Sequence, residues 1–546
     1  MFSRKTALAG AAIALSALAL TACTAGSGGA NGGSSHLTLD LNHLASTTTP
    51  GTQPVAKLTW NLPYEPLSLD PMHSFNYAEN TVIANLCESL LRQNPDLSVS
   101  PGLAEKVATP NDTTYVYTIR DGVTFWDGSP LTAEDVAYSL QRQTGASSTS
   151  YFSSYFTNVA SVKVTGTREV TVTLSKPDSL FPQSMSSAAG AIVKMSAAKA
   201  AGDQFGTPNG GLECTGPYAL DKWNSGKSIE LKKNPTYWDS SLKRLVEHVS
   251  FSFITDETTA VNALRNGDVD GQYFYLPPTG LSQLEKSSSV KTTFGKSFVF
   301  WALAGTSDTG PFANPKVRQA LLDVIDRNAL AQVVFQGAAV AAPTLAGPDY
   351  WGYQKSTFET AFSSYSAKTD VAAAKKLLDE VGPITQPIVL GVQGSSAVHE
   401  QTANLIQAAG AAIGLKIQTK VIPVEQFGNL YSDPTARKGL DGFFTTFYGN
   451  FADPLDIYQA FRTGNMNNFN NYQGANDIVE KAISTTDPAE RAKLTVDAQT
   501  TITRDAPWMP LAYEPTTLVQ NKRISGATAS IAYLYYPWAA TIGGVK

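Results

Sequence analysis

Charged residues are scarce in this sequence: Lys, Arg, Asp and Glu make up 16% of its 546 residues, whereas soluble proteins average about 25%. The formal net charge is −5, and no stretch is dense in Lys and Arg. Because nucleic acid is bound by neutralising its phosphates, this composition argues against a nucleic-acid partner. Hydrophobic residues make up 42%, so the chain can bury large cores. Its length indicates roughly two to four domains.

Histidine and cysteine are scarce as well, with five and three copies. Three cysteines exclude a scaffold held mainly by disulfides. Two of the histidines, His36 and His43, lie in a tract rich in Gly, Ser and Thr, which argues against a metal centre built from histidines. We therefore predict no metal site and no cofactor.

Motifs of hydrolases are missing or incomplete. Neither Gly-x-Ser-x-Gly nor His-Glu-x-x-His occurs. Ser-x-x-Lys occurs at Ser196/Lys199 and Ser240/Lys243, but neither copy is followed by the Ser-Asp-Asn or Lys-Thr-Gly that an acylation site of this type needs. We predict no catalytic residue, and a secreted hydrolase is kept only as a lower alternative.

The N-terminus has the layout of a secretion signal. Arg4 and Lys5 precede an apolar run over residues 7–20, and small residues lead from there to Cys23. At about 1.5 Å per residue the run is too short to span a bilayer of about 30 Å. The Leu-Thr-Ala that precedes Cys23 resembles a bacterial lipobox. We therefore predict a lipoprotein signal peptide over residues 1–22 and a lipidated Cys23 that anchors the chain to the extracytoplasmic face of the cell membrane.

A polar tract follows the predicted anchor. Residues 24–54 hold six Gly, four Ser and six Thr, with Asp40 as the only charged residue. Such a tract cannot build a core, so we predict a flexible linker over residues 23–56. Its typical reach would be roughly 30 Å. A globular body held just above a membrane suits a receptor that hands its ligand to a membrane partner.

Beyond the linker the hydrophobic pattern is mixed α/β. Alternating apolar residues predict strands at 115–119, 162–164 and 170–174, the last two forming a hairpin. Start and stop signals predict helices at 133–142, 314–325, 370–382 and 398–413, and an alternating strand follows at 415–421. Helices that alternate with strands are typical of α/β lobes.

A set of short segments carries a resemblance to a known family. They are Tyr117–Gly128, Thr132–Leu140, Thr215–Tyr218, Asn234–Trp238, and Asn314–Leu321 with Ile325–Arg327, extended by Asp370–Gly382 and Asp505–Pro510. Each has an ordinary structural role, such as an Asp-Gly turn or a helix cap. In this order and spacing, however, they resemble solute-binding protein family 5, the peptide/nickel-type receptors of ABC importers. The resemblance covers roughly residues 57–540.

The resemblance implies an α/β fold of the two-lobed periplasmic-binding-protein type II, with hinged lobes and an additional domain inserted in lobe one. Mapped onto this sequence, lobe one comprises residues 57–84, 209–305 and 508–546, the additional domain residues 85–208, and lobe two residues 306–507. The chain would then cross between the lobes near residues 305 and 508. Two crossing segments permit a hinge that closes on a ligand.

Within the cleft that the resemblance implies, the best-localised candidate site is a loop that contains Phe447, Tyr448, Asn450 and Asp453. In peptide-binding members of the family, a loop of this kind ends in an acidic residue followed by Pro. Four positions before that Pro it carries an aspartate that pairs with the α-ammonium of the peptide. Here Asp453-Pro454 keeps the ending, but Asn450 stands in place of the aspartate.

The amide at position 450 changes the expected chemistry. An ionised carboxylate forms hydrogen bonds roughly twice as strong as those of a neutral acceptor, whereas the amide oxygen of Asn450 accepts without charge. A free α-amino group would therefore bind less well, unless Asp453, Asp456 or Glu425 reaches it. Asn450 would equally suit a neutral or hydroxyl-rich ligand.

Further aromatic residues complete the predicted pocket, namely Trp301, Tyr350, Trp351, Phe75 and Tyr77. Aromatic walls give a large apolar contact with few strict polar demands, which suits a receptor that accepts several related ligands. We predict a short peptide as the ligand, with an oligosaccharide or another polar metabolite as the alternative.

Two cysteines remain beside the predicted lipidation site. In an oxidising exterior an even pair suggests a disulfide, so we predict a bridge between Cys87 and Cys214. It would join the additional domain to lobe one, and the alternative is two buried thiols.

The resemblance implies that the protein is a monomeric substrate-binding lipoprotein and not an enzyme. It would capture its ligand in the hinged cleft and deliver it to the permease/ATPase complex of an ABC importer. A sensor that signals without transport needs the same closing cleft, so it stays open as a further interpretation.

Overall fold

A large mixed sheet forms the centre of the fold in the computed structural model, which describes residues 39–145, 148–274 and 278–546. Within these residues the sheet has eleven strands: β1 (Val55–Leu62), β8 (Tyr218–Asn224), β9 (Ser228–Lys233), β10 (Val246–Phe253), β11 (Gly271–Tyr273), β12 (Val290–Gly305), β13 (Val340–Ala341), β14 (Ile388–Gln393), β15 (Ile417–Ile422), β16 (Gly442–Tyr448) and β17 (Trp508–Asn521). Their order is β15-β14-β16-β12-β17-β11-β1-β10-β9-β8, and β13 pairs with β17 beside this path. The pairs β1–β10, β1–β11, β14–β15 and β14–β16 are parallel, and the other pairs are antiparallel.

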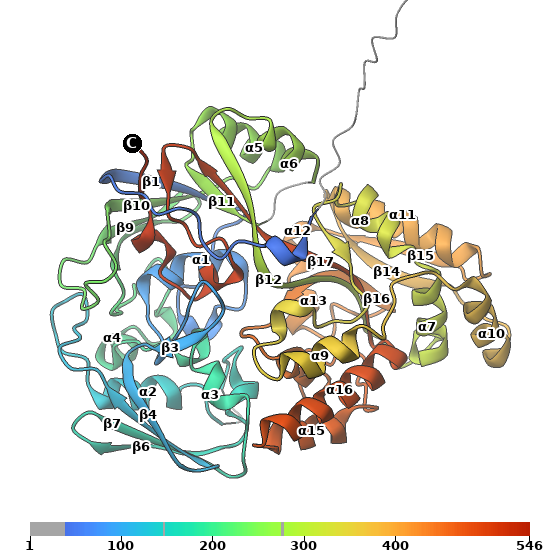
Figure 1. Cartoon of the computed structure of the whole chain (residues 1–546), viewed down its shortest axis with the longest axis horizontal. Helices are drawn as coiled ribbons and strands as arrows, with labels where there is room; N and C mark the ends of the chain where they lie inside the picture. Colours follow the sequence, from blue (N-terminus) through green and yellow to red (C-terminus); the bar gives the residue numbers. More distant parts are fainter. Residues whose placement is uncertain (1–38, 146–147, 275–277) are drawn as a thin grey trace, which may run out of the picture. The chain divides into compact units, whose positions relative to one another are not determined.

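Two long antiparallel strands, β12 and β17, join the two halves of this sheet and run side by side (Figure 1). The first part of β12 pairs with residues 516–521, next to β11, and its second part pairs with residues 508–514 and with β16. The register shifts between Gly295 and Val299. This irregularity marks where the shared strands pass from one half of the sheet to the other.

A separate antiparallel sheet lies in the segment that we assigned to an additional domain. Its order is β4 (Ala104–Asn111), β5 (Thr114–Ile119), β7 (Glu169–Leu174) and β6 (Val159–Gly166). The predicted strands and the predicted hairpin of β6 and β7 are confirmed. Short two-stranded pairs are formed by β2 (Leu91–Gln93) with β3 (Val99–Pro101) and by β18 (Ile524–Ser525) with β19 (Gly543–Gly544).

The helices cover these sheets. The α-helices are α1 (Tyr77–Leu86), α2 (Ala133–Gln141), α3 (Phe181–Ser184), α4 (Met195–Ala201), α5 (Glu257–Asn266), α6 (Pro278–Glu285), α7 (Pro315–Val324), α8 (Arg327–Val333), α9 (Lys355–Phe362), α10 (Val371–Val381), α11 (Ala397–Ala411), α12 (Val424–Phe427), α13 (Asn429–Ser432), α14 (Leu455–Tyr458), α15 (Asn476–Ser484) and α16 (Pro488–Asp505). The 3-10 helices are η1 (Leu41–His43), η2 (Pro71–His73), η3 (Ser153–Phe156), η4 (Ala188–Gly190), η5 (Gly202–Gln204), η6 (Pro311–Ala313), η7 (Pro348–Tyr350), η8 (Gln459–Phe461), η9 (Ile531–Leu534) and η10 (Trp538–Thr541). Among the described residues, no helix is both long and apolar enough to span a bilayer.

Side-chain caps start the helices that the sequence predicted. Thr132 and Asp135 form a reciprocal capping box at α2, in which each satisfies a backbone N–H of the other. Asn314 caps α7 and is followed by a proline in the first turn, and Asp370 caps α10. These predicted helix starts are confirmed. They could be predicted because hydrogen bonds between near neighbours determine them.

The predicted flexible linker is wrong for the part of it that the structure describes. Ala45 N donates to Phe294 O at 3.0 Å, Thr48 N donates to Ala527 O at 2.9 Å, and Gly544 N donates to Gln53 O at 2.8 Å. Thr48 is buried. The segment has few apolar residues, of which Leu41 and Ala45 pack against the core, and its backbone groups pair with other segments and hold it in place. The predicted signal peptide and Cys23 lie outside the described residues.

Candidate ligand-binding site

The predicted binding loop follows β16 and leads into α14. Its turn requires a glycine, because a Cβ on Gly449 would lie 2.5 Å from Tyr350 Cε1 and 2.8 Å from Asp456 Oδ2. Gly449 N donates to Tyr350 OH at 2.7 Å, and Tyr350 OH donates to Phe298 O at 2.7 Å. Tyr350 therefore ties the start of the loop to the irregular region of β12.

Asn450, in the segment assigned to lobe two, contacts residues of both the predicted additional domain and lobe one. Its Nδ2 donates to Tyr155 OH on η3 at 2.7 Å, and its Oδ1 accepts from Tyr535 OH, just after η9, at 2.5 Å. Its backbone carbonyl accepts from Gln93 Nε2 at 3.0 Å. The amide group thus bridges elements far apart in the sequence.

Tyr448 reaches the start of α1, where two predicted residues lie. Its ring packs against Tyr77 with centroids 4.9 Å apart, and its hydroxyl donates to Phe75 O at 3.3 Å. Asn80 Nδ2 donates to the same hydroxyl at 3.2 Å. Phe75 in turn packs against Tyr151, with centroids 5.2 Å apart. The structure therefore brings Phe75, Tyr77, Tyr448 and Asn450 into one cluster of aromatic, hydroxyl and amide groups.

Two buried aspartates of the loop have different surroundings. Asp453 is fully buried, pairs with Arg491 at 3.3 Å, and accepts from Gln183 and from Leu455 N, the first residue of α14. Asp456 accepts from Tyr155 OH at 2.5 Å and from Asn450 N at 2.6 Å. Burial raises the pKa of Asp456 to about 7. Asp453 therefore holds the loop in place, whereas Asp456 belongs to the cluster.

The other predicted site residues lie away from this cluster. Trp301 is 2% exposed and packs against Phe335, His399 and Phe444, so it has a core role. Phe447 and Trp351 are partly buried: the nearest rings are Phe300 and Trp508 for Phe447, and Phe362 for Trp351. Alternation explains the position of Phe447, whose side chain faces the opposite side of the sheet from that of its neighbour Tyr448. Trp301 pairs with Thr446 and shares the face of Tyr448, but it lies two residue pairs further along the strands.

Sequence reasoning missed Tyr155 and Tyr535, which supply the hydroxyl partners of Asn450. A signal was present. Tyr155 belongs to the aromatic run 151–156 and Tyr535 to the run 533–538, and both runs interrupt segments rich in Ser and Ala. Such runs mark either a core or a binding surface, and only the fold shows which.

Cys87 and Cys214 are joined by a disulfide, with Cα atoms 5.0 Å apart. The bond connects the residue after α1 to the residue before the Thr-Gly-Pro-Tyr segment. Next to it, Thr215 Oγ1 donates to Glu88 Oε2 at 3.0 Å. The disulfide therefore lies within a polar network rather than at the Asn450 cluster.

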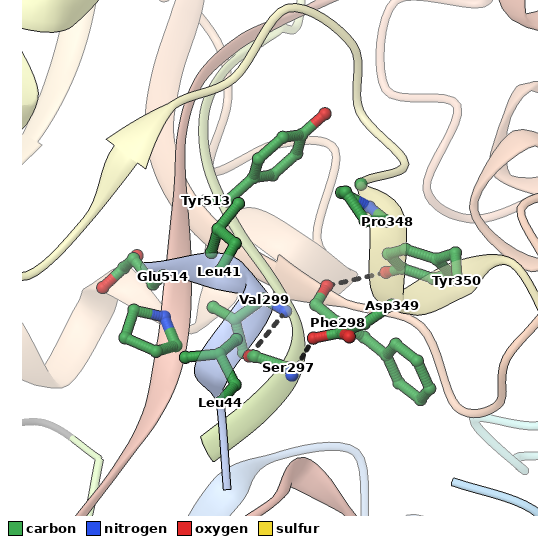
Figure 2. A pocket seen from close by; sticks show the side chains of 12 residues that line it. Leu41, Leu44, Ser297, Phe298, Val299, Pro348, Asp349, Tyr350, Tyr513 and Glu514 are labelled. Atoms are coloured by element: carbon green, nitrogen blue, oxygen red, sulfur yellow. Dashed lines mark hydrogen bonds between the residues drawn. The ribbon is translucent and has the colours of Figure 1, made fainter. Parts of the chain in front are cut away.

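A pocket beside the shared strands is lined in part by the N-terminal segment. Figure 2 shows Leu41 and Leu44 lying over β12 and β17, close to Glu514. Glu514 Oε1 is buried and has no hydrogen-bond partner among the described residues. Burial raises the pKa of this carboxyl to about 8. The pocket holds Tyr350 but none of the other predicted binding residues.

Comparison with known families identifies the protein class. Residues 98–469 match the family described as bacterial extracellular solute-binding proteins, family 5 Middle. The chain belongs to this family. The resemblance inferred from the short segments is thereby confirmed.

Curated relatives of this family 5 protein are binding proteins. The chain is 26% identical over 470 residues to the glutathione-binding protein GsiB of Salmonella typhi, covering 84% of this chain and 89% of that protein. It is 25% identical over 469 residues to GsiB of Escherichia coli (strain K12), with the same coverage of 84% and 89%. The protein is therefore an extracytoplasmic substrate-binding protein of an ABC importer.

Solved structures of similar fold support the predicted architecture. One is the periplasmic binding protein AgaA of A. tumefaciens R10 with agropinic acid, at a TM-score of 0.78 and 22% identity, covering 90% of this chain and 99% of that one. Another is DppA of Helicobacter pylori with the peptide STSA, at a TM-score of 0.78 and 21% identity, with the same coverage of 90% and 99%. The two-lobed periplasmic-binding-protein type II fold is confirmed.

Proposed function

We propose that this family 5 protein captures a short peptide between its lobes and delivers it to the permease/ATPase complex of an ABC importer. It does so as a monomer anchored by a lipid on Cys23. The observation that carries the proposal is the convergence of Tyr448, Asn450 and Asp456 with side chains of α1, η3 and η9. Curated relatives named as glutathione-binding proteins favour a peptidic ligand.

The cluster has the chemistry of a peptide site. Tyrosine faces give apolar contact to side chains, while hydroxyl and amide groups can donate to and accept from peptide units. Such neutral groups bind a backbone without selecting its side chains. A ligand that contacts these groups on both lobes binds the closed state more tightly than the open state and so favours closure. The permease then recognises the closed form.

We place the hinge at the register shift of β12 and at the facing residues of β17, Glu514 and Thr516. This position lies inside the shared strands rather than at their ends near 305 and 508. An interrupted ladder has fewer hydrogen bonds to strain when the strands bend. The lobe boundaries given above then shift by several residues, and the additional domain stays with lobe one.

Native mass spectrometry of the purified full chain tests the ligand class directly, because it shows the mass of whatever is bound. Isothermal titration with di- to tetrapeptides and with oligosaccharides then measures affinity. Tyr448→Ala should weaken peptide binding about tenfold or more, as expected for an aromatic contact in the site. Tyr458→Phe is the matched control, because its hydroxyl bonds Gln499 away from the cluster.

An oligosaccharide is the second candidate, because Asn450 and the tyrosine faces also suit hydroxyl-rich ligands. Sugar binding that is lost in Tyr448→Ala, with no peptide binding, would replace the peptide proposal. Recovery of the ligand chemically unchanged after release separates a receptor from a hydrolase. Transport lost on deletion of the gene separates an importer subunit from a sensor.

The lipid anchor has its own test. We expect Cys23→Ala to move the protein from the membrane fraction to the soluble fraction without changing ligand affinity. Mass spectrometry of the N-terminal peptide should show the lipid on Cys23 in the parent chain. An unmodified Cys23 in membrane-bound protein would contradict the anchor. Light scattering of the soluble variant tests the monomer.

A further inference from the structure

A directed hydrogen-bond chain passes through the Asn450 cluster. Tyr535 OH donates to Asn450 Oδ1 at 2.5 Å, and Asn450 Nδ2 donates to Tyr155 OH at 2.7 Å. Tyr155 OH donates to Asp456 Oδ1 at 2.5 Å. Each group passes its hydrogen in the same direction. The chain ends on a carboxylate, which accepts and does not donate when ionised.

Asp456 determines this direction. Its Oδ2 accepts from Asn450 N at 2.6 Å, and its Oδ1 also accepts from Gln459 Nε2 at 2.9 Å. Because both oxygens accept, Tyr155 gives its hydroxyl hydrogen to Asp456. The oxygen of Tyr155 is then left as an acceptor. Only a donor at position 450 satisfies it, which an amide nitrogen does and a carboxylate does not.

We propose that Asp456 is a specificity-determining positioning residue that, through Tyr155, demands a neutral amide at position 450. It thereby keeps a second carboxylate out of the binding loop. The protein would then favour peptides or other polar molecules held through amide, carbonyl and hydroxyl groups over those held through a free α-ammonium. This inference deepens the proposed function and rests on it.

Exchanging the two residues should reverse the chain. In Asn450→Asp/Asp456→Asn, the carboxylate at position 450 accepts from both Tyr155 and Tyr535, and the amide nitrogen at position 456 donates to Tyr155. The side-chain amide of Gln459 then turns so that its oxygen accepts from the same nitrogen. In Asn450→Asp alone, two carboxylates share one hydroxyl hydrogen. In Asp456→Asn alone, the new amide nitrogen takes the place of an acceptor, so the hydroxyl hydrogen of Tyr155 faces another donor. Both single variants leave a buried group unsatisfied, which is costly.

The groups that surround Asp456 are mostly neutral. The titratable side chains that act on it or that it acts on are Tyr151, Tyr155, Tyr350, Asp453 and Tyr535. Asp453 has its own partner in Arg491. Burial is the largest cause of the raised pKa of Asp456, about 7. The demand for a donor at position 450 should therefore be stronger at pH 8, where Asp456 is ionised, than at pH 5.

Denaturant unfolding of the full chain without ligand tests the chain of bonds. We expect each single variant to lower the folding equilibrium constant about tenfold at pH 8. The exchange variant should recover most of this loss, with a coupling of about tenfold or more. At pH 5 the coupling should shrink. Losses that simply add at both pH values would overturn the proposal.

Two tyrosine variants make the test specific. In a Tyr155→Phe background the coupling between positions 450 and 456 should vanish, because the hydroxyl that transmits it is gone. Tyr458→Phe removes another buried tyrosine hydroxyl, on the same helix as Asp456, and should leave the coupling unchanged. Coupling that survives Tyr155→Phe would contradict transmission through this hydroxyl.

Titration with free and N-acetylated forms of one tripeptide tests specificity. The parent chain should bind both forms within about threefold. The exchange variant should favour the free amine about tenfold, the value of one charge-assisted bond. Equal preference in a stable exchange variant overturns the specificity claim. If neither form binds the parent chain, the peptide proposal fails. The coupling measured by denaturant unfolding without ligand still tests the hydrogen-bond chain.

Discussion

Two buried carboxylates of this protein are bonded by tyrosine hydroxyls, yet their surroundings differ in charge. Glu88 accepts from Tyr237 OH at 2.8 Å and lies 3.3 Å from Arg92 Nη2, while Arg92 Nη1 pairs with Asp239 at 2.7 Å. Asp456 accepts from Tyr155 OH at 2.5 Å, but among the described residues no Lys or Arg forms an ion pair with it.

The difference separates a structural network from the one that we propose binds ligand. Around Glu88, the cation of Arg92 and donors from Trp238 and Thr215 satisfy the carboxylate from several sides. Around Asp456, only neutral donors do so, and one of them belongs to the predicted ligand-binding loop. When a buried carboxylate has no cation beside it, only hydrogen bonds stabilise its charge, so each neighbouring group must direct a donor toward it. We therefore expect charge changes to unfold the first region and to alter specificity in the second.

The largest effect should come from removing the cation of the Glu88 network. Arg92→Met leaves Glu88 and Asp239 buried without their charge partner, which should cost about 4 kcal/mol of unfolding free energy. Arg168→Met is the control, because its pair with Glu105 is exposed at the surface and should cost under about 1 kcal/mol. Denaturant unfolding measures both, and equal losses would remove the contrast.

Next in size is the disulfide beside the same network. The variant Cys87→Ser/Cys214→Ser should lose about 3 kcal/mol, because the bridge closes a loop with a sequence separation of 127 residues. Reduction of the parent chain should give the same loss. Ligand affinity should stay within about twofold, because the disulfide lies outside the Asn450 cluster. A large loss of affinity would show that the two regions are coupled.

A matched pair of hydroxyl deletions compares the two regions directly. Tyr155→Phe removes one of the donors to Asp456 and also leaves Asn450 Nδ2 without its acceptor, so we expect a loss of about 2 kcal/mol. Tyr237→Phe removes one of several donors to Glu88, so the loss should be about 1 kcal/mol. If denaturant unfolding showed the larger loss for Tyr237→Phe, the buried groups around Asp456 would be the better satisfied by hydrogen bonds.

The last effect is absent at low pH and concerns a carboxyl with neither cation nor hydroxyl partner. The pKa of Glu514 rises from 4.5 to about 8 on burial. The folded state then binds more protons than the unfolded one between these values, so stability falls as the pH rises through this window. Glu514→Gln should leave stability at pH 5 nearly unchanged and raise it at pH 8, by up to about 3 kcal/mol. Parallel curves for the two proteins would contradict this.

Local sequence signals predicted a large part of the fold because local interactions produce it. The capping box of Thr132 and Asp135, the Asn314-Pro315 helix start and the β6–β7 hairpin need only neighbours within a few residues. The motif segments also predicted the family and its two-lobed architecture correctly. The segment 45–53 was misjudged because its order comes from backbone bonds to residues near 294, 527 and 544.

The candidate site also has one part that the sequence predicted and one part that it did not. The loop residues Tyr448 and Asn450 could be found from the sequence, because a motif ending in Asp-Pro marks them. The partners Tyr155 and Tyr535 could not, since they lie 295 and 85 residues away from Asn450 and no periodicity links them. Hydrogen-bond direction depends on which groups meet, and the fold alone brings these groups together. The residue types of the binding loop are thus readable in the sequence, whereas the reason for an amide at position 450 lies in the tertiary structure.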